Sequence, residues 1–133
     1  MKISLHVLPL IAALFVASAV WADSPTQVEG ATTVDAATAK VLFDRGVSFV
    51  DVRGDGYYGM GHIPGAVDLG LAKAFGEAEL AKVVSKDQEV VIYCDGPRCL
   101  LSSTACEMAV SWGFKKVYYF RDGYPAWKAA GYP

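Results

Sequence analysis

The chain of 133 residues predicts an α/β domain with a central, mainly parallel sheet flanked by helices. Segments with strand character alternate with segments whose apolar residues recur at helical spacing, as expected when helices connect the strands of one sheet. Two of the strands are apolar on both faces, which is typical of strands covered by helices on either side. The length suits one domain of ordinary size.

The first half of the chain supplies a helix, two strands and the loops between them. Asp35 is a favourable N-cap for the helix, and Arg45-Gly46 ends it. The loop after the first strand is rich in glycine and tyrosine, and Ile63-Pro64-Gly65 forms a turn. The expected order is helix 36–44, strand 47–52, loop 53–61 and strand 66–69.

The second half repeats this alternation on either side of a cysteine-containing loop. Leu80, Val83 and Val84 recur at helical spacing, and Asp87-Gln88 turns the chain into an apolar strand. The helix after the cysteine loop has one apolar face, and Gly113 ends it. The expected order is helix 77–84, strand 90–93, helix 102–112, strand 117–120 and a helical turn at 126–130.

The N-terminal segment is typical of a secretory signal peptide. Lys2 gives it a positive start, 7–20 is an apolar run, and Val20-Trp21-Ala22 fits cleavage after Ala22. An uncleaved membrane anchor is the alternative, although the run is short of the roughly 20 residues of a spanning helix. We expect a signal peptide at 1–22, a flexible leading segment at 23–31 and the folded domain at 32–133.

Cleavage would leave a weakly acidic domain in the periplasm or outside the cell. The whole chain has 12 basic and 14 acidic residues, so removal of Lys2 leaves 11 against 14, a net charge of −3. A surface of this sign gives no electrostatic reason to bind nucleic acid. We therefore expect no nucleic-acid partner, and no stable membrane insertion after cleavage.

The three cysteines indicate where the chemistry lies. Cys94, Cys99 and Cys106 fall within thirteen residues, and an odd number in an oxidising compartment leaves at least one thiol unpaired or reactive. Cys106 suits a buried position, as a small hydrophobic residue. His62 is the only histidine after the signal peptide, so the residue types do not suit zinc or an iron–sulfur cluster. We expect no metal and no cofactor.

Cys94 has the sequence context of an activated thiol. It follows the buried strand 90–93 and precedes a short loop and a helix. The N–H groups of 95–100, except that of Pro97, and the positive end of the helix dipole stabilise a thiolate there. Ligands of open α/β sheets bind outside the carboxyl ends of the strands, so we expect the site at Cys94.

Four motifs, in this order, resemble those of a single-domain rhodanese-like sulfurtransferase. They are Asp51-Val52-Arg53, the turn Gly61-His62-Ile63-Pro64-Gly65-Ala66, the strand that delivers Cys94, and a closing segment Asp122-Gly123-Tyr124-Pro125-Ala126-Trp127 followed by Gly131-Tyr132-Pro133. The resemblance covers about 32–133. It implies the rhodanese-like three-layer sandwich and a persulfide intermediate at Cys94, with a small sulfur-containing substrate such as thiosulfate and a thiol or cyanide as acceptor.

The chemistry of the neighbouring residues predicts further roles around Cys94. The loop of Asp95, Gly96 and Leu100, continuing to Leu101, would bind an anionic sulfur donor, and Arg98 is the expected anion-binding side chain. Four further motif residues are expected to have structural roles: Asp51, Arg53, Gly61 and His62. Asp51 and Arg53 would pair at the end of the strand. No general base is needed if the thiolate is preformed.

The cysteine loop departs from the usual family pattern, in which glycine stands three residues and arginine five residues after the cysteine. Here Gly96 and Arg98 come earlier, and Cys99 takes the arginine position, as in family members with a C-x-G-P-x-C loop. Cys99 could attack a Cys94 persulfide, release sulfide and leave a disulfide, acting as a resolving thiol. It could also simply pack under the loop.

Three functions therefore stay open from the sequence. The first is an exported sulfurtransferase that works through a Cys94 persulfide. The second is a thiol redox or persulfide-reductase protein that uses Cys94 and Cys99, with a periplasmic protein thiol as partner. The third is a non-catalytic rhodanese-like binding module.

Overall fold

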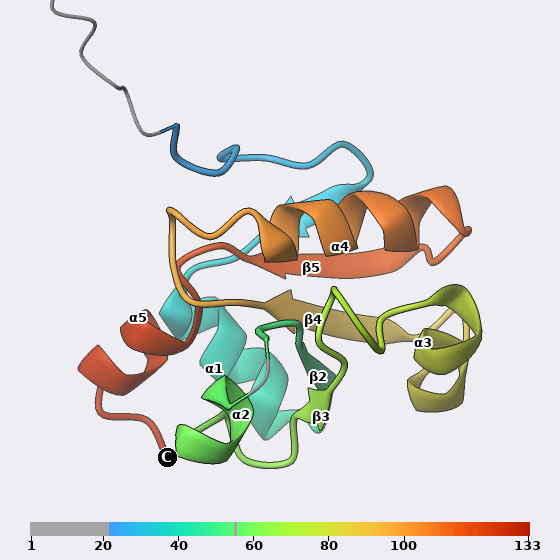
Figure 1. The fold of residues 1–133 in the computed structure, drawn as a ribbon. Helices are drawn as coiled ribbons and strands as arrows, with labels where there is room; N and C mark the ends of the chain where they lie inside the picture. Colours follow the sequence, from blue (N-terminus) through green and yellow to red (C-terminus); the bar gives the residue numbers. More distant parts are fainter. Residues whose placement is uncertain (1–21, 55) are drawn as a thin grey trace, which may run out of the picture.

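The computed structural model describes residues 22–54 and 56–133, so almost all of the predicted signal peptide lies outside the described residues. Figure 1 shows one layered domain. Its strands are β1 (Ala31–Thr33), β2 (Ser48–Asp51), β3 (Val67–Asp68), β4 (Glu89–Tyr93) and β5 (Lys116–Phe120). Its helices are α1 (Ala36–Asp44), α2 (Tyr57–Met60), α3 (Glu77–Val83), α4 (Leu101–Ser111) and α5 (Gly123–Ala129).

The five strands form one sheet in the order β1-β5-β4-β2-β3, and every pair is parallel. The central strand β4 pairs with β2 along Ser48–Asp51 and with β5 along Lys116–Phe120. Because all strands run the same way, their carboxyl ends lie along one edge of the sheet. The predicted α/β class with a central parallel sheet is confirmed.

Helices cover both faces of the sheet, as Figure 1 shows. Alternate residues of β4 belong to two separate apolar clusters, with Val90 and Ile92 in one and Val91 and Tyr93 in the other. The first cluster also contains buried side chains of α3 and α4, and the second contains those of α1 and α5. A strand with an apolar residue on each face is stable only between two such layers, which explains the run of apolar residues in β4.

The structure adds two elements that the sequence did not predict. The edge strand β1 has only three residues, and the helix α2 has only four, within the loop expected at 53–61. Helix α5 begins at Gly123, three residues before the expected helical turn. Short elements such as these are held by tertiary pairing and carry little periodicity of their own.

The segment expected to be a flexible leader, 23–31, makes specific contacts with the domain. Ser24 is buried, and both its backbone N–H and its hydroxyl donate to the carbonyl oxygen of Pro97, each at 2.7 Å. The carbonyl of Ser24 accepts from Arg121, and that of Pro25 accepts from the hydroxyl of Tyr119. Its polar composition suggested mobility, but these hydrogen bonds tie residues 24–25 to the domain.

Among the described residues no helix is long and apolar enough to cross a membrane.

Candidate active site

Cys94 lies at the carboxyl end of the central strand, where the sequence placed the site. Tyr93, the last residue of β4, pairs with Asp51 on one side and Phe120 on the other, and Cys94 follows it with no exposed surface. The loop 95–100 then leads to α4, which begins at Leu101. Cys94 therefore lies where the carboxyl ends of the strands meet, between the ends of the neighbouring strands and the start of a helix.

Cys94 and Cys99 form a disulfide, with their Cα atoms 6.4 Å apart. The bond closes a loop of a few residues, in which the N–H of Cys99 donates to the carbonyl oxygen of Gly96 at 3.0 Å. Gly96 has φ of 109°, a conformation that side chains disfavour, so glycine at this position allows the tight turn. The loop thus brings the second thiol, which the sequence left open, into bonding distance of the first.

The closing segment of the chain holds Cys94 from the other side. The N–H of Tyr124 donates to the carbonyl oxygen of Cys94 at 3.0 Å. Gly123 approaches so closely that the Cβ atom of any other residue would overlap with this same oxygen, and its φ of 62° also favours glycine. The start of α5 therefore fixes the backbone of Cys94, a role that the sequence reasoning did not assign to Gly123.

The start of α4 lacks a side-chain cap and contains a buried hydroxyl without a hydrogen-bond partner. Leu100 occupies the N-cap position and makes no side-chain capping hydrogen bond. The hydroxyl of Ser102 is buried and is the only described buried side-chain polar atom without a hydrogen-bond partner. Ser102 lies on the same helix face as Ala105 and Cys106, which pack in the same cluster as Cys94. These features favour an anion or thiolate at this end of α4.

Arg53 links the end of β2 to the cysteine loop. Its guanidinium donates to both carboxylate oxygens of Asp51, the shortest bond being 2.7 Å, and to the carbonyl oxygen of Gly61 at 2.7 Å. A further nitrogen lies 3.7 Å from the carboxylate of Asp95, and the group stacks 4.7 Å from the ring centre of Tyr124. The ion pair and hydrogen bonds to Asp51 raise the pKa of Arg53 despite burial. Asp51, Arg53 and Gly61 therefore brace the loop that follows β2.

Tyr93 completes this buried network. Its hydroxyl donates to Asp51 at 3.0 Å and accepts from the N–H of Ile63 at 3.1 Å. Burial and the nearby Asp51 carboxylate raise the pKa of Tyr93, so the phenol stays protonated and keeps donating. The network thus joins the Gly61–Ala66 turn to the carboxyl end of β4, just before Cys94.

His62 lies in the turn and is engaged there. Its Nδ1 is 2.7 Å from the carbonyl oxygen of Tyr58, and since a carbonyl only accepts, Nδ1 carries the proton. The imidazole stacks on the ring of Tyr58 with centres 3.6 Å apart. Nothing in these contacts brings His62 to Cys94, so the structure assigns it no part in a cysteine–histidine pair.

A hollow of about 320 Å³ opens beside the disulfide. Arg98, the predicted anion-binding residue, lies on its wall and is exposed, and Cys99 is partly exposed there. Asp95 and Leu101 also line it, whereas Leu100 is the exposed N-cap residue. A neighbouring hollow of about 250 Å³ shares three residues with it, Arg53, Tyr57 and Asp95. Of the loop residues predicted to bind substrate, Asp95, Arg98 and Leu101 thus line one opening, whereas Gly96 and Leu100 do not line it.

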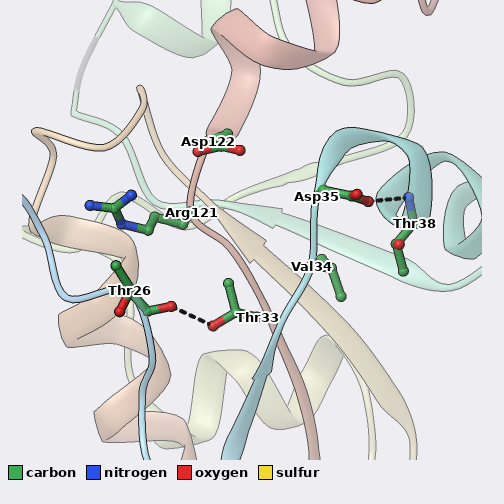
Figure 2. Close-up of a pocket in the computed structure, with 7 residues that line it drawn as sticks. All are labelled: Thr26, Thr33, Val34, Asp35, Thr38, Arg121 and Asp122. Atoms are coloured by element: carbon green, nitrogen blue, oxygen red, sulfur yellow. Dashed lines mark hydrogen bonds between the residues drawn. The ribbon is translucent and has the colours of Figure 1, made fainter.

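Figure 2 shows another hollow, of about 420 Å³, at the carboxyl ends of β1 and β5. Its polar groups already have structural roles. Asp35 accepts from the N–H of Thr38 at 2.8 Å as the N-cap of α1, and this bond lowers the pKa of Asp35. Arg121 donates to the carbonyl of Ser24, and Thr33 to that of Thr26. No cysteine lines this hollow, so the candidate site for sulfur chemistry is the cysteine loop.

Cys106 stands apart from the other two cysteines. It is fully buried in α4, and this burial raises the pKa of its thiol well above the usual value. Among the described residues no group of three or more histidine, cysteine or acidic side chains is arranged to hold a metal ion. Burial thus leaves the Cys106 thiol without access to a substrate in the hollow beside the cysteine loop.

A profile of the rhodanese-like domain matches residues 35–130. A thiosulfate sulfurtransferase GlpE of Coxiella burnetii is 32% identical over 85 residues, which cover 64% of this chain and 75% of that protein. A tRNA uridine(34) hydroxylase of Buchnera aphidicola is 35% identical over 92 residues, and an HTH-type transcriptional regulator of Mycobacterium tuberculosis is 34% identical over 87 residues. The matches cover 62% and 65% of this chain, but only 27% and 37% of those two longer proteins.

Solved structures show the same architecture. The rhodanese-like domain of an Anabaena protein superimposes with a TM-score of 0.65 at 28% identity, covering 76% of each chain. The human single-domain sulfurtransferase TSTD1 superimposes with a TM-score of 0.61 at 23% identity, covering 74% of this chain and 96% of that one. At this identity, the similarity to the human protein concerns the fold alone.

Proposed function

Because the chain belongs to the family of rhodanese-like domain proteins, we propose that it is a sulfurtransferase whose Cys94 carries sulfane sulfur as a persulfide. The observation that carries the proposal is the placement of Cys94 at the carboxyl end of the central strand, directly before the loop and the uncapped start of α4. Helix N-termini and loop N–H groups stabilise the negative charge of a thiolate or a persulfide.

Sulfur transfer would proceed through two nucleophilic substitutions at sulfur atoms. The Cys94 thiolate attacks the outer sulfur of thiosulfate, the sulfur–sulfur bond of the donor breaks, and sulfite leaves with the bonding electron pair. The terminal sulfur of the resulting persulfide is then attacked by a thiolate or by cyanide, which restores the Cys94 thiolate. Arg98, on the wall of the adjoining hollow, would bind the anionic donor.

The disulfide favours a second candidate function, persulfide reduction. In this reaction Cys99 attacks the inner sulfur of the Cys94 persulfide, and the outer sulfur leaves as hydrosulfide with the proton of the Cys99 thiol. The product is the Cys94–Cys99 disulfide, the state of the two residues in the structure. Each turnover then consumes two electrons from a thiol reductant, for which a protein thiol in the periplasm is a suitable partner. The signal-like segment at 1–22 supports export to that compartment.

Mass spectrometry of the reduced protein tests the proposal. After reduction and removal of the reductant, thiosulfate should add one sulfur atom to the peptide that contains Cys94. The Cys94→Ser variant should gain nothing, and the Cys99→Ser variant should keep the adduct without releasing sulfide. If wild type and Cys99→Ser gain no sulfur at Cys94 from thiosulfate or from polysulfide, the protein is not a sulfurtransferase of this kind.

If sulfide release proceeds at the wild-type rate in Cys99→Ser, the reductase candidate is wrong while the transferase stands. The same experiment therefore separates the two functions. The Cys106→Ala variant serves as the control, because its buried thiol takes no part in either reaction.

A further inference from the structure

The two sulfur atoms of the disulfide differ in their access to solvent. Cys94 has no exposed surface, whereas Cys99 is partly exposed and lines the hollow of about 320 Å³ beside the loop. A hollow of this size accommodates a small molecule or the end of a side chain from another protein. An incoming thiol therefore meets the sulfur of Cys99 first.

The burial of Cys94 is enforced by its neighbours on several sides. Its backbone continues the central strand, its carbonyl accepts from Tyr124, and the absence of a side chain at Gly123 lets α5 press against it. Its side chain packs in the cluster formed by α3, α4 and the sheet. In the disulfide form these contacts keep Cys94 without exposed surface, while Cys99 remains partly exposed.

The surroundings of Cys94 also suit a departing thiolate. Thiol–disulfide exchange is faster when the departing sulfur is stabilised as a thiolate. Cys94 adjoins the loop before the uncapped first turn of α4, where the hydroxyl of Ser102 is buried without a partner. Cys99 directly precedes the N-cap residue of the same helix and is partly exposed. Access thus selects the sulfur of Cys99 for attack, and the surroundings of Cys94 suit the thiolate that leaves.

We propose that a thiol reductant opens the disulfide by attacking the Sγ atom of Cys99, so that the mixed disulfide forms on Cys99 and Cys94 is released. The reductant thiolate forms a bond to Cys99, the bond between Cys99 and Cys94 breaks, and its electron pair stays on the Cys94 thiolate. A second thiol from the reductant then displaces Cys99 and completes its reduction.

This order has a consequence for the cycle, and it rests on the proposed function because it takes Cys94 as the sulfur carrier. While the reductant remains on Cys99, the resolving thiol is blocked and Cys94 is already a free thiolate. A sulfur donor that arrives in this interval charges Cys94 without immediate release of sulfide. The sulfur can then pass to an external acceptor. A reductant bound to Cys99 thus favours sulfur transfer, whereas a free Cys99 thiol favours reduction of the Cys94 persulfide to sulfide.

Trapping of the mixed disulfide tests this proposal. Oxidised Cys106→Ala protein, which retains only the two cysteines in question after residue 22, is mixed briefly with glutathione in the presence of excess iodoacetamide. Peptide mapping should find glutathione on Cys99 and the alkyl group on Cys94, with this isomer in about tenfold excess or more over the reverse. Glutathione found mainly on Cys94 would overturn the proposal.

The test is independent of sulfur transfer. The same preparation, fully reduced, is treated with thiosulfate to measure persulfide formation at Cys94. A persulfide at Cys94 together with glutathione mainly on Cys94 refutes only the order of reduction. Glutathione on Cys99 without any persulfide refutes the proposed function and leaves the order of reduction intact.

Discussion

Arg53 supports the candidate site through a buried ion pair and a hydrogen bond to the turn that follows. Its guanidinium is buried with the Asp51 carboxylate, and it reaches the turn at Gly61 and the acid at Asp95. A buried ion pair adds little net stability, but removal of one partner leaves an uncompensated charge in the interior. The pair is therefore more important for integrity than an exposed pair of similar length.

We expect Arg53→Met to lower the free energy of unfolding by about 3–5 kcal/mol, because Asp51 loses its counter-ion. Urea unfolding followed by circular dichroism measures this. Lys82→Met is the matched control, since it removes an exposed pair with Glu79 at 2.8 Å and should cost no more than about 1 kcal/mol. Equal losses in the two variants would contradict the structural role of Arg53.

The leading segment acts on the cysteine loop as a strap, which we define as Ser24 and Pro25. Ser24 makes two hydrogen bonds to the carbonyl of Pro97, inside the loop closed by the disulfide, and Arg121 and Tyr119 hold the strap on the domain. Two segments far apart in the sequence thus stabilise each other. The predicted cleavage after Ala22 would leave the strap close to the new N-terminus.

Removal of the Ser24 hydroxyl should loosen the loop. In Ser24→Ala one hydrogen bond is lost, with a cost of about 1 kcal/mol, and we expect several-fold faster hydrogen exchange at the amides of Asp95, Gly96, Arg98 and Cys99. The control is Ser111→Ala, which removes an exposed hydroxyl that bonds to the carbonyl of Met108 at 2.6 Å. If both variants exchange at the wild-type rate in the loop, the strap does not restrain it.

The fold as a whole was predictable because its signals are strong and local. The apolar run of β4, the Asp35 cap of α1 and the alternation of strands and helices suffice for the class of fold. The strap and the strand β1 were not predictable, since they depend on partners distant in sequence, and the four-residue helix α2 is too short to show a helical period. A polar segment such as 23–31 reads as a loop whether or not its backbone finds acceptors in the domain.

The site was predictable in part. The position of Cys94 follows from the strand and helix on either side of it, and the pairing of Asp51 with Arg53 follows from the motif that contains both. The bond between Cys94 and Cys99 could not be fixed, because spacing alone does not say whether two thiols point towards each other. The closeness of Gly123 to Cys94 and the unpartnered hydroxyl of Ser102 are tertiary facts without a sequence signal.

We propose that the two cysteines of this rhodanese-like domain act in a fixed order, Cys94 first and Cys99 second. Time-resolved mass spectrometry of the fully reduced protein after addition of thiosulfate tests this order directly, with sulfide measured in the same samples. We expect a persulfide on Cys94 to appear first and then to decay into the Cys94–Cys99 disulfide, with one sulfide released per disulfide formed. Disulfide formation without a preceding persulfide on Cys94, or sulfur found on Cys99 instead, would contradict it.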